Sequence, residues 1–299
     1  MNVLMLRRSA GFWGTLCVLG AASGFGTTPM FSRLAFEDGL TVSVVVFFRY
    51  FLPCLVFSYC FLGLLRRWKH AFPFFACGAA MAVGTYGYAI GIRDMDIAMA
   101  AIIFFSFPIF VTLFKFLLFK SRPSGVEYIT LGLILAAVAL VAGPVDLEQV
   151  PLSSLLITFT APAAYASVLL VVSIPTNQLL PIQSTALISL GGLVGSILLI
   201  WIKGIGFALP QTQSGWMSAM GLALIATLLP NLLLSLGAAR AGPLRTAIAG
   251  TFELPVTLCL GWAVIAEPVQ LNQVGGSILI ILALALSVHA TREKAELPD

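Results

Sequence analysis

Charged residues are scarce in this sequence. Asp, Glu, Lys and Arg make up only 9% of its 299 residues, whereas 60% are hydrophobic. An ordinary soluble domain carries about 25% charged residues, so this chain has too little polar surface to cover a water-soluble core. The mean hydropathy of +1.03 agrees with this reading. The composition therefore predicts a membrane protein.

Motifs of catalysis and of metal binding are missing as well. The sequence has no G-x-S-x-G, H-E-x-x-H or Walker loop, which argues against a hydrolase and against a nucleotide-driven pump. Its five cysteines fall within apolar runs without metal-ligand spacing, so we expect packing residues and no disulfide framework. We expect no cofactor, no metal site and no enzyme activity.

Ten apolar runs are each about as long as a helix that crosses a hydrocarbon core of about 30 Å. The runs are continuous, whereas β-barrel strands alternate apolar and polar residues. The predicted fold is therefore an all-α polytopic membrane protein with ten transmembrane helices. An alternative with nine helices stays open, because the sixth run carries Pro162 and an uncharged loop follows it. The runs cover about residues 10–34, 41–65, 71–91, 97–119, 126–143, 153–173, 183–203, 216–239, 246–265 and 272–291.

The basic residues predict the orientation. Ten helices place both termini on one side, and eleven of the sixteen Lys and Arg residues flank the helix ends on that side. Only Arg33, Arg93 and Lys203 flank the opposite ends. Because basic residues favour the cytoplasm, we expect a bacterial inner-membrane protein with both termini cytoplasmic and the first helix uncleaved. The net charge of +4 follows from this bias and does not indicate nucleic acid.

Two segments of the chain resemble each other around Pro108 and Pro255. They read "AAIIFFSFPIFVTLFKFLLFK" and "TAIAGTFELPVTLCLGWAVIAE", and each leads through a short turn to a helix with an early glycine. The repeat predicts two halves, residues 10–143 and 153–291, with five helices each. Because five is odd, the second half would run through the membrane inverted. Inverted repeats of this kind support alternating access around a site near the midplane.

The same segments resemble the drug/metabolite transporter superfamily, in particular its EamA-type branch of ten helices. The resemblance rests on "LRTAIAGTFELPVTLCLGWAVIAEPVQLNQVGGSILIILA" near the C-terminus and on "GAASGFGTTPMFSRLAFEDG" and "FFRYFLPCL" near the N-terminus. It implies a transporter and covers nearly the whole chain. Two positions depart from the family's pattern. The family's E-P is "E-L-P" here, and Lys120 stands where the family has an acid.

Two ionisable residues lie deep in the predicted spans, Arg49 in the second and Glu253 in the ninth. Each costs about 2.5–3.5 kcal/mol on insertion scales and normally faces a cavity or a partner. At 1.5 Å per residue their predicted heights differ by less than about 10 Å. Two interpretations of each stay open. Glu253 is either a neutral structural group or a cavity group that meets substrate or proton, and Arg49 either ties helix ends or binds substrate. Lys115, nearer the cytoplasmic end, is expected to extend its amine to the interface.

Prolines and polar side chains within the spans predict where a cavity lies. A proline inside a helix frees a carbonyl, which at membrane depth must face protein or a water-filled cavity. The alternative is that the hydroxyls only join neighbouring helices. The predicted helix-break residues are Pro29, Pro108, Pro162, Pro230 and Pro255. The predicted cavity residues, besides Arg49 and Glu253, are Thr27, Thr28, Tyr86, Tyr88, Ser106, Tyr165, Asn231 and Thr251.

These features together predict an inner-membrane exporter of small polar metabolites, with amino acids or related compounds as the leading substrate class. A zwitterion suits a site with one cation, one carboxyl group and aromatic walls. A multidrug exporter and a nucleotide-type metabolite exporter are the alternatives within transport, and an intramembrane enzyme is the alternative outside it. The expected partners are a small-molecule substrate and the lipid bilayer. Proton coupling and a homodimer are open questions at this stage.

Overall fold

The computed structural model describes residues 3–61, 67–94, 103–120, 123–142, 151–174, 179–203, 209–264 and 270–294. Helices account for nearly all of this part of the chain, and no strand occurs in it. The first half contains α1 (Val3–Phe25), α2 (Thr28–Glu37), α3 (Val42–Val56), the short η1 (Ser58–Cys60), α5 (Trp68–Asp94), α7 (Phe107–Phe119) and α8 (Gly125–Ala142). The second half contains α9 (Leu152–Thr158), α10 (Thr160–Ser173), α11 (Pro181–Lys203), α12 (Gln213–Ala223), the π-helical η3 (Leu224–Leu228), α13 (Leu229–Ala241), α14 (Pro243–Gly250), α15 (Glu253–Val264) and α16 (Leu271–Lys294).

Five helical stretches are long and apolar enough to cross a membrane. They are Trp68–Gly91, Leu152–Ser173, Pro181–Ile202, Gln213–Ala241 and Pro243–Val264. Four further apolar helices are shorter, at Val42–Val56, Ile103–Phe119, Gly125–Val141 and Leu271–Leu286. The predicted class of an all-helical, multi-pass membrane protein is therefore confirmed, and the count of ten spans stays a prediction.

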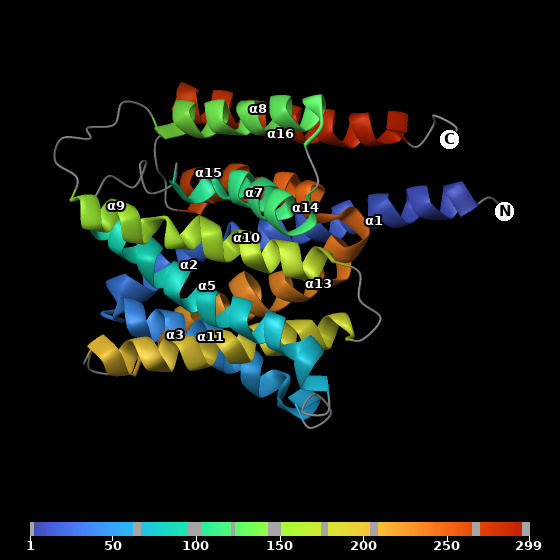
Figure 1. Cartoon of the computed structure of the whole chain (residues 1–299). Helices are drawn as coiled ribbons and strands as arrows, with labels where there is room; N and C mark the ends of the chain where they lie inside the picture. The colour runs from blue at the N-terminus through green and yellow to red at the C-terminus, as the bar shows by residue number, and fades with distance from the viewer. Residues whose placement is uncertain are drawn as a thin grey trace.

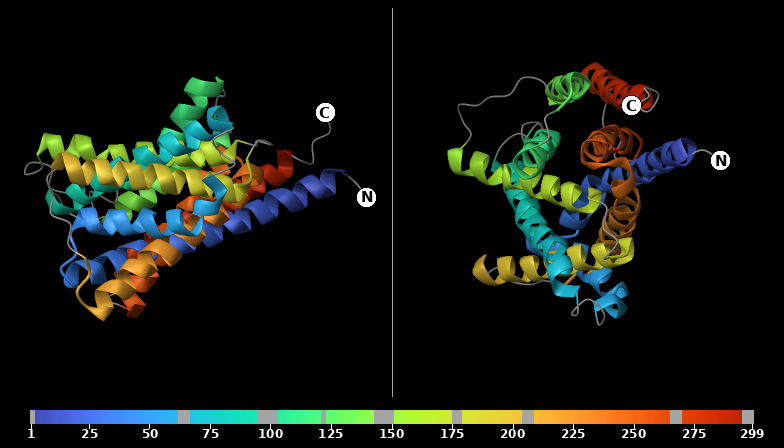
Figure 2. Two further views of the ribbon diagram at one scale, coloured as in Figure 1. Left: turned by 90° about the horizontal axis from the view of Figure 1, so that it is seen from below. Right: turned by 45° about the vertical axis from the view of Figure 1, so that its right-hand side comes forward.

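The helices lie roughly side by side, with α8 and α16 stacked together at one edge of the bundle (Figures 1 and 2). The start of α1 and the end of α16 lie at the same end of the bundle in both figures. An even number of crossings has this consequence, so the arrangement agrees with both termini on one side.

Packing in one half of the chain has a counterpart in the other. The most extensive contacts join α5 to α11, α1 to α13 and α8 to α16. If each helix is replaced by its counterpart in the other half, the contact of α1 with α13 corresponds to the contact of α10 with α5. The contact of α5 with α11 likewise corresponds to that of α12 with α3, and all four pairs are in contact. This pattern agrees with an architecture of two repeats.

Small residues allow the closest of these approaches. A Cβ on Gly14 of α1 would lie 2.8 Å from the carbonyl oxygen of Gly237 on α13. A Cβ on Gly191 of α11 would overlap the carbonyl oxygen of Phe75 on α5. Lipid gives helices no hydrophobic reason to associate, so close backbone packing of this kind holds such bundles together. The main buried cluster lies among α1, α7, α10, α13 and α14 and extends to α5, α8, α11 and α16.

Candidate substrate site

Four helical stretches are interrupted in their middle, and we call these interruptions the helix breaks. They fall between α1 and α2, before α7, between α9 and α10, and between α14 and α15. At each break a side-chain hydroxyl donates to the carbonyl three residues earlier. The bonds run from Thr27 to Gly24 (2.7 Å), Ser106 to Ile103 (2.5 Å), Thr160 to Ile157 (2.6 Å) and Thr251 to Ile248 (2.6 Å). Each of these carbonyls also accepts a backbone N–H, so the hydroxyl adds a second, local hydrogen bond at the end of the interrupted helix.

A proline follows the hydroxyl by two residues at three of the breaks, as Pro29, Pro108 and Pro162. Pro29 and Pro108 lie in the first turn of the helix after the break, where a missing N–H costs little. At the fourth break Pro255 follows Thr251 by four residues instead. Pro230 lies in the first turn of α13, directly after the π-helical segment η3. All five predicted prolines thus lie close to an irregularity in a helix.

Glu253 is the first residue of α15 and directly follows the turn at Thr251 and Phe252. It stands two residues before Pro255, the place that a hydroxyl occupies at the other three breaks. A carboxylate in the first turn of a helix is favoured by the positive end of the helix dipole. The break therefore gives Glu253 a polar setting inside an otherwise apolar run.

Arg49 of α3 and Glu253 of α15 are close enough for their charges to interact. Neither group forms an ion pair within 4.0 Å or a hydrogen bond among the described residues. The Nε atom of Arg49 is buried and has no hydrogen-bond partner there. Both side chains are only half-buried although they lie deep in the protein. The two opposite charges therefore lie inside the protein without direct contact, and of the two only Arg49 lines the small interior cavity among the described residues.

A small cavity of about 20 Å³ lies beside Arg49. Its other polar walls are Tyr165, Asn231 and Tyr50, which was not predicted, and Phe25 and Ile188 are among its apolar ones. One water molecule needs roughly 10–15 Å³ measured in this way, so the cavity holds about one water. The interior beside the guanidinium is therefore nearly closed in this conformation.

Aromatic rings surround Tyr165 on α10. Its ring centroid lies 4.8 Å from that of Phe107, 5.6 Å from that of Phe104 and 6.0 Å from that of Phe25. Tyr88 of α5 joins the group through Phe104, at 5.2 Å. The charge of Glu253 acts on both tyrosines, and that of Arg49 acts on Tyr165. The structure thus brings Arg49, Glu253, Tyr88 and Tyr165 together.

The other predicted cavity residues are placed less centrally. Thr27, Ser106 and Thr251 use their hydroxyls within the helix breaks, and Thr251 is fully buried. The hydroxyl of Thr28 is buried without a partner among the described residues. Tyr86 does not line the small cavity. Tyr88 does not line it either, and because the two tyrosines are two positions apart they point to different faces of α5.

Thr185 of α11 was not predicted and belongs beside the site. Its Oγ1 lies 3.3 Å from the carbonyl oxygen of Asn231 and 3.1 Å from the hydroxyl of Ser235, and it is fully buried. It fixes α11 against α13 next to the cavity. A single Thr in an apolar run carries no signal that separates this role from ordinary helix packing. No group of three or more His, Cys, Asp or Glu side chains that could hold a metal occurs among the described residues.

Comparison with known proteins identifies relatives of the chain. A model of the EamA-like transporter family matches residues 12–143 and again residues 152–289. A solved structure titled only "Crystal structure of protein" is similar over 94% of this chain and 98% of its own, with a TM-score of 0.70 and 15% sequence identity. At that identity the likeness shows the fold alone. No curated protein matches the sequence.

Proposed function

This chain belongs to the EamA-like transporter family, and we propose that it exports small zwitterions, namely amino acids or related compounds, across the inner membrane. The observation that carries the proposal is the pair of opposite charges, Arg49 and Glu253, which lie close together inside the protein without an ion pair or hydrogen bond between them. An arginine binds a carboxylate through two parallel N–H donors. In the proposed complex Arg49 holds the carboxylate of the substrate and Glu253 holds its ammonium group.

The surroundings of the pair support a substrate of this kind. Removing a single charge from water costs several kcal/mol, so a buried site accepts an ion only where an opposite charge meets it. A zwitterion brings both charges and neutralises both residues. Tyr165 and Asn231 add hydroxyl and amide groups in the cavity beside Arg49. Because a buried carboxylate without an opposite charge is costly, Glu253 would bind a proton when no ammonium group is present.

Alternating access is the proposed mechanism. The two matched segments form two repeats of five predicted helices, the second inverted relative to the first. The helix breaks lie beside the site, since Phe25, Phe107 and Glu253 each lie within two residues of one of them. Bending at the breaks would open the site to one side of the membrane at a time. Both termini are placed in the cytoplasm.

The rival substrate classes fit the geometry less well. A multidrug site favours a wide, mainly apolar pocket, whereas two opposite charges at depth favour a ligand that carries both charges; the cavity of about 20 Å³ beside Arg49 is closed to either ligand in this conformation. A nucleotide brings several negative charges, and Arg49 is the one cation that the described structure places beside Glu253. An intramembrane enzyme needs a nucleophile with a base or a metal cluster at depth, and the residues described at this site include neither.

Transport by the purified protein tests the proposal. Proteoliposomes that contain the protein are screened for uptake of radiolabelled amino acids, with labelled nucleotides and a cationic dye as comparison substrates. We expect saturable uptake of at least one amino acid and none of the nucleotides or the dye. Uptake of nucleotides or dye without uptake of any amino acid would refute the proposal.

A further inference from the structure

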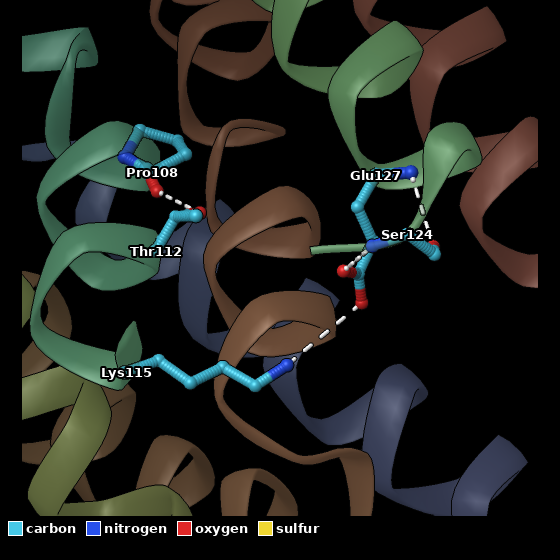
Figure 3. A network of polar contacts seen from close by, with 5 residues as sticks. All are labelled: Pro108, Thr112, Lys115, Ser124 and Glu127. Carbon is cyan, nitrogen blue, oxygen red and sulfur yellow. Dashed lines mark hydrogen bonds and ion pairs between the residues drawn. The ribbon is translucent and has the colours of Figure 1, made fainter. Parts of the chain in front are cut away.

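A charged pair joins α7 to α8 outside the candidate substrate site. The amine of Lys115 lies 3.9 Å from a carboxylate oxygen of Glu127, and the two side chains are only 24% and 27% exposed (Figure 3). The other carboxylate oxygen accepts a hydrogen bond from the backbone N–H of Ser124 at 2.7 Å. The hydroxyl of Ser124 accepts from the N–H of Glu127 in return, at 3.4 Å, which completes a capping box. Lys115 was expected to extend to the membrane surface. Its amine contacts Glu127, whose carboxylate supplies a fixed opposite charge, and its position relative to the membrane surface stays a prediction.

The second half has a neutral pair in a corresponding place. The indole N–H of Trp262 on α15 donates to the side-chain oxygen of Gln273 on α16, at 2.9 Å. Trp262 follows Pro255 by seven residues, and Lys115 follows Pro108 by seven residues. In both halves the partner lies near the N-terminus of the next helix. We call the two contacts the helix ties.

The ties connect α7 and α15 to two helices, α8 and α16, whose most extensive contact is with each other, although all of them share the main buried cluster. The main partner of α8 is α16, and these two helices form one edge of the molecule (Figure 1). The main partners of α7 are α10 and α14, which border the substrate site. Each tied helix, α7 or α15, starts at a helix break beside that site. A tie therefore links a helix that would bend during transport to the edge formed by α8 and α16.

We propose that Lys115 and Glu127 form a positioning pair that makes α8 and α16 move with α7 when α7 pivots at its break. The proposal rests on the proposed function, because it assigns the pair a part in alternating access. The physical reason is the cost of separation. Removal of one partner from a partly desolvated ion pair leaves an uncompensated charge, so the two helices are held together while either moves. Trp262 and Gln273 do the same for α15 with a weaker, uncharged bond.

Proximity is tested first, without any need for transport. Dicyclohexylcarbodiimide in proteoliposomes activates a carboxyl group, and a neighbouring amine then displaces the urea to form an amide of zero added length. We expect a cross-linked peptide that joins Lys115 to Glu127 and is found by mass spectrometry of the wild-type protein. Absence of this peptide overturns the proposal whatever the protein transports.

Transport kinetics form the second arm. Wild type, Lys115→Gln, Glu127→Gln and the exchange Lys115→Glu with Glu127→Lys are compared for uptake of a mixture of twenty ¹⁴C-labelled amino acids. We expect each single variant to lower the maximal rate about fivefold or more, with half-saturation changed less than about twofold, because the pair does not touch substrate. The exchanged pair should restore at least half of the rate.

The control is Lys69→Gln, which removes an exposed lysine and should leave the rate unchanged. Single variants at the wild-type rate would overturn the proposal, and so would a loss that the exchange fails to restore. If wild type forms the cross-link but transports no amino acid, the proposed function fails. The positioning role then fails with it, and the pair is left as a structural tie only.

Discussion

Arg49 and Glu253 come from different halves of the chain and face the same interior, yet no ion pair or hydrogen bond joins them to each other or to any described residue. Two opposite charges at membrane depth would lower their energy by direct contact, since each alone costs several kcal/mol there. The absence of direct contact in this structure is what a ligand with both charges requires. The first two predictions test the two sides of this gap separately.

Glu253→Gln keeps the shape of the side chain and removes its charge. We expect normal insertion but a fall in amino-acid transport of about tenfold or more, because a hydrogen bond to a charged group contributes roughly 1.5–3 kcal/mol. Whatever dependence on pH the wild type has between about pH 5 and 8 should also weaken, because an amide cannot take up a proton. Initial rates across this range, at matched protein content in the liposomes, measure both effects.

The matched control for Glu253 is Glu37→Gln, which removes an exposed carboxylate at the end of α2. It should transport at the wild-type rate, since its partner Arg33 is exposed too. Wild-type rates and an unchanged pH profile in Glu253→Gln would leave this residue as a structural group and contradict its proposed role.

Arg49→Lys tests whether the guanidinium is needed for its geometry as well as for its charge. Lysine keeps the charge but cannot form two parallel bonds to a carboxylate. We therefore expect the half-saturating amino-acid concentration to rise about tenfold, the loss of roughly one charge-assisted bond. Arg33→Lys at the exposed end of α2 provides the comparison and should change nothing. Equal affinities in Arg49→Lys and wild type would contradict the proposed role of Arg49 in binding the carboxylate of the substrate.

Gly191→Ala tests the close packing of α5 against α11. The new methyl group would overlap the carbonyl oxygen of Phe75, so the helices must separate. Overpacking of this kind costs about 1–3 kcal/mol. The matched control is Gly132→Ala in α8, where a Cβ meets nothing within 4 Å. It should be neutral or more stable by about 0.5–1 kcal/mol, because alanine favours helix. Unfolding in dodecyl sulfate measures both variants, and equal stabilities would contradict the described packing.

The topology predicts that a reporter fused after Asp299 is active only in the cytoplasm. The start of α1 and the end of α16 lie at the same end of the bundle (Figure 1), and the basic residues favour the cytoplasm for that end. A green fluorescent reporter should therefore fluoresce at the C-terminus, and an alkaline phosphatase fusion there should be inactive. The opposite pattern would indicate an odd number of crossings or an inverted orientation.

The helical membrane class and the family could be predicted from the sequence because both depend on local patterns. Apolar runs have a required length in a bilayer, and the segments around Pro108 and Pro255 resemble each other directly. Arg49 and Glu253 stood out for a related reason. Charge at membrane depth is costly, so charged residues are rare in the predicted spans and each one is easy to recognise.

The contacts between helices could not be predicted in the same way. Nothing in the sequence pairs Thr185 with Asn231 and Ser235, which lie about fifty residues away, because a hydroxyl in an apolar run fits many neighbours. The contact between Lys115 and Glu127 was not predicted, because the two residues lie on either side of a turn. The hydroxyl bonds of Thr27 and Ser106 to carbonyls three residues earlier were not predicted either, because a hydroxyl at a helix break can bond locally or face a cavity with the same sequence.

The claim that Arg49 and Glu253 hold the two charges of one zwitterion is tested most directly by competition with analogues that lack one charge. Uptake of a labelled amino acid that the wild-type protein transports is measured against an excess of the same unlabelled amino acid, its methyl ester or its N-acetyl derivative. The ester lacks the carboxylate and the acetyl compound lacks the ammonium group. The account predicts that the free amino acid competes strongly and that each derivative needs a concentration about tenfold higher or more to compete as well. Competition by either derivative as strong as that of the free amino acid would contradict it.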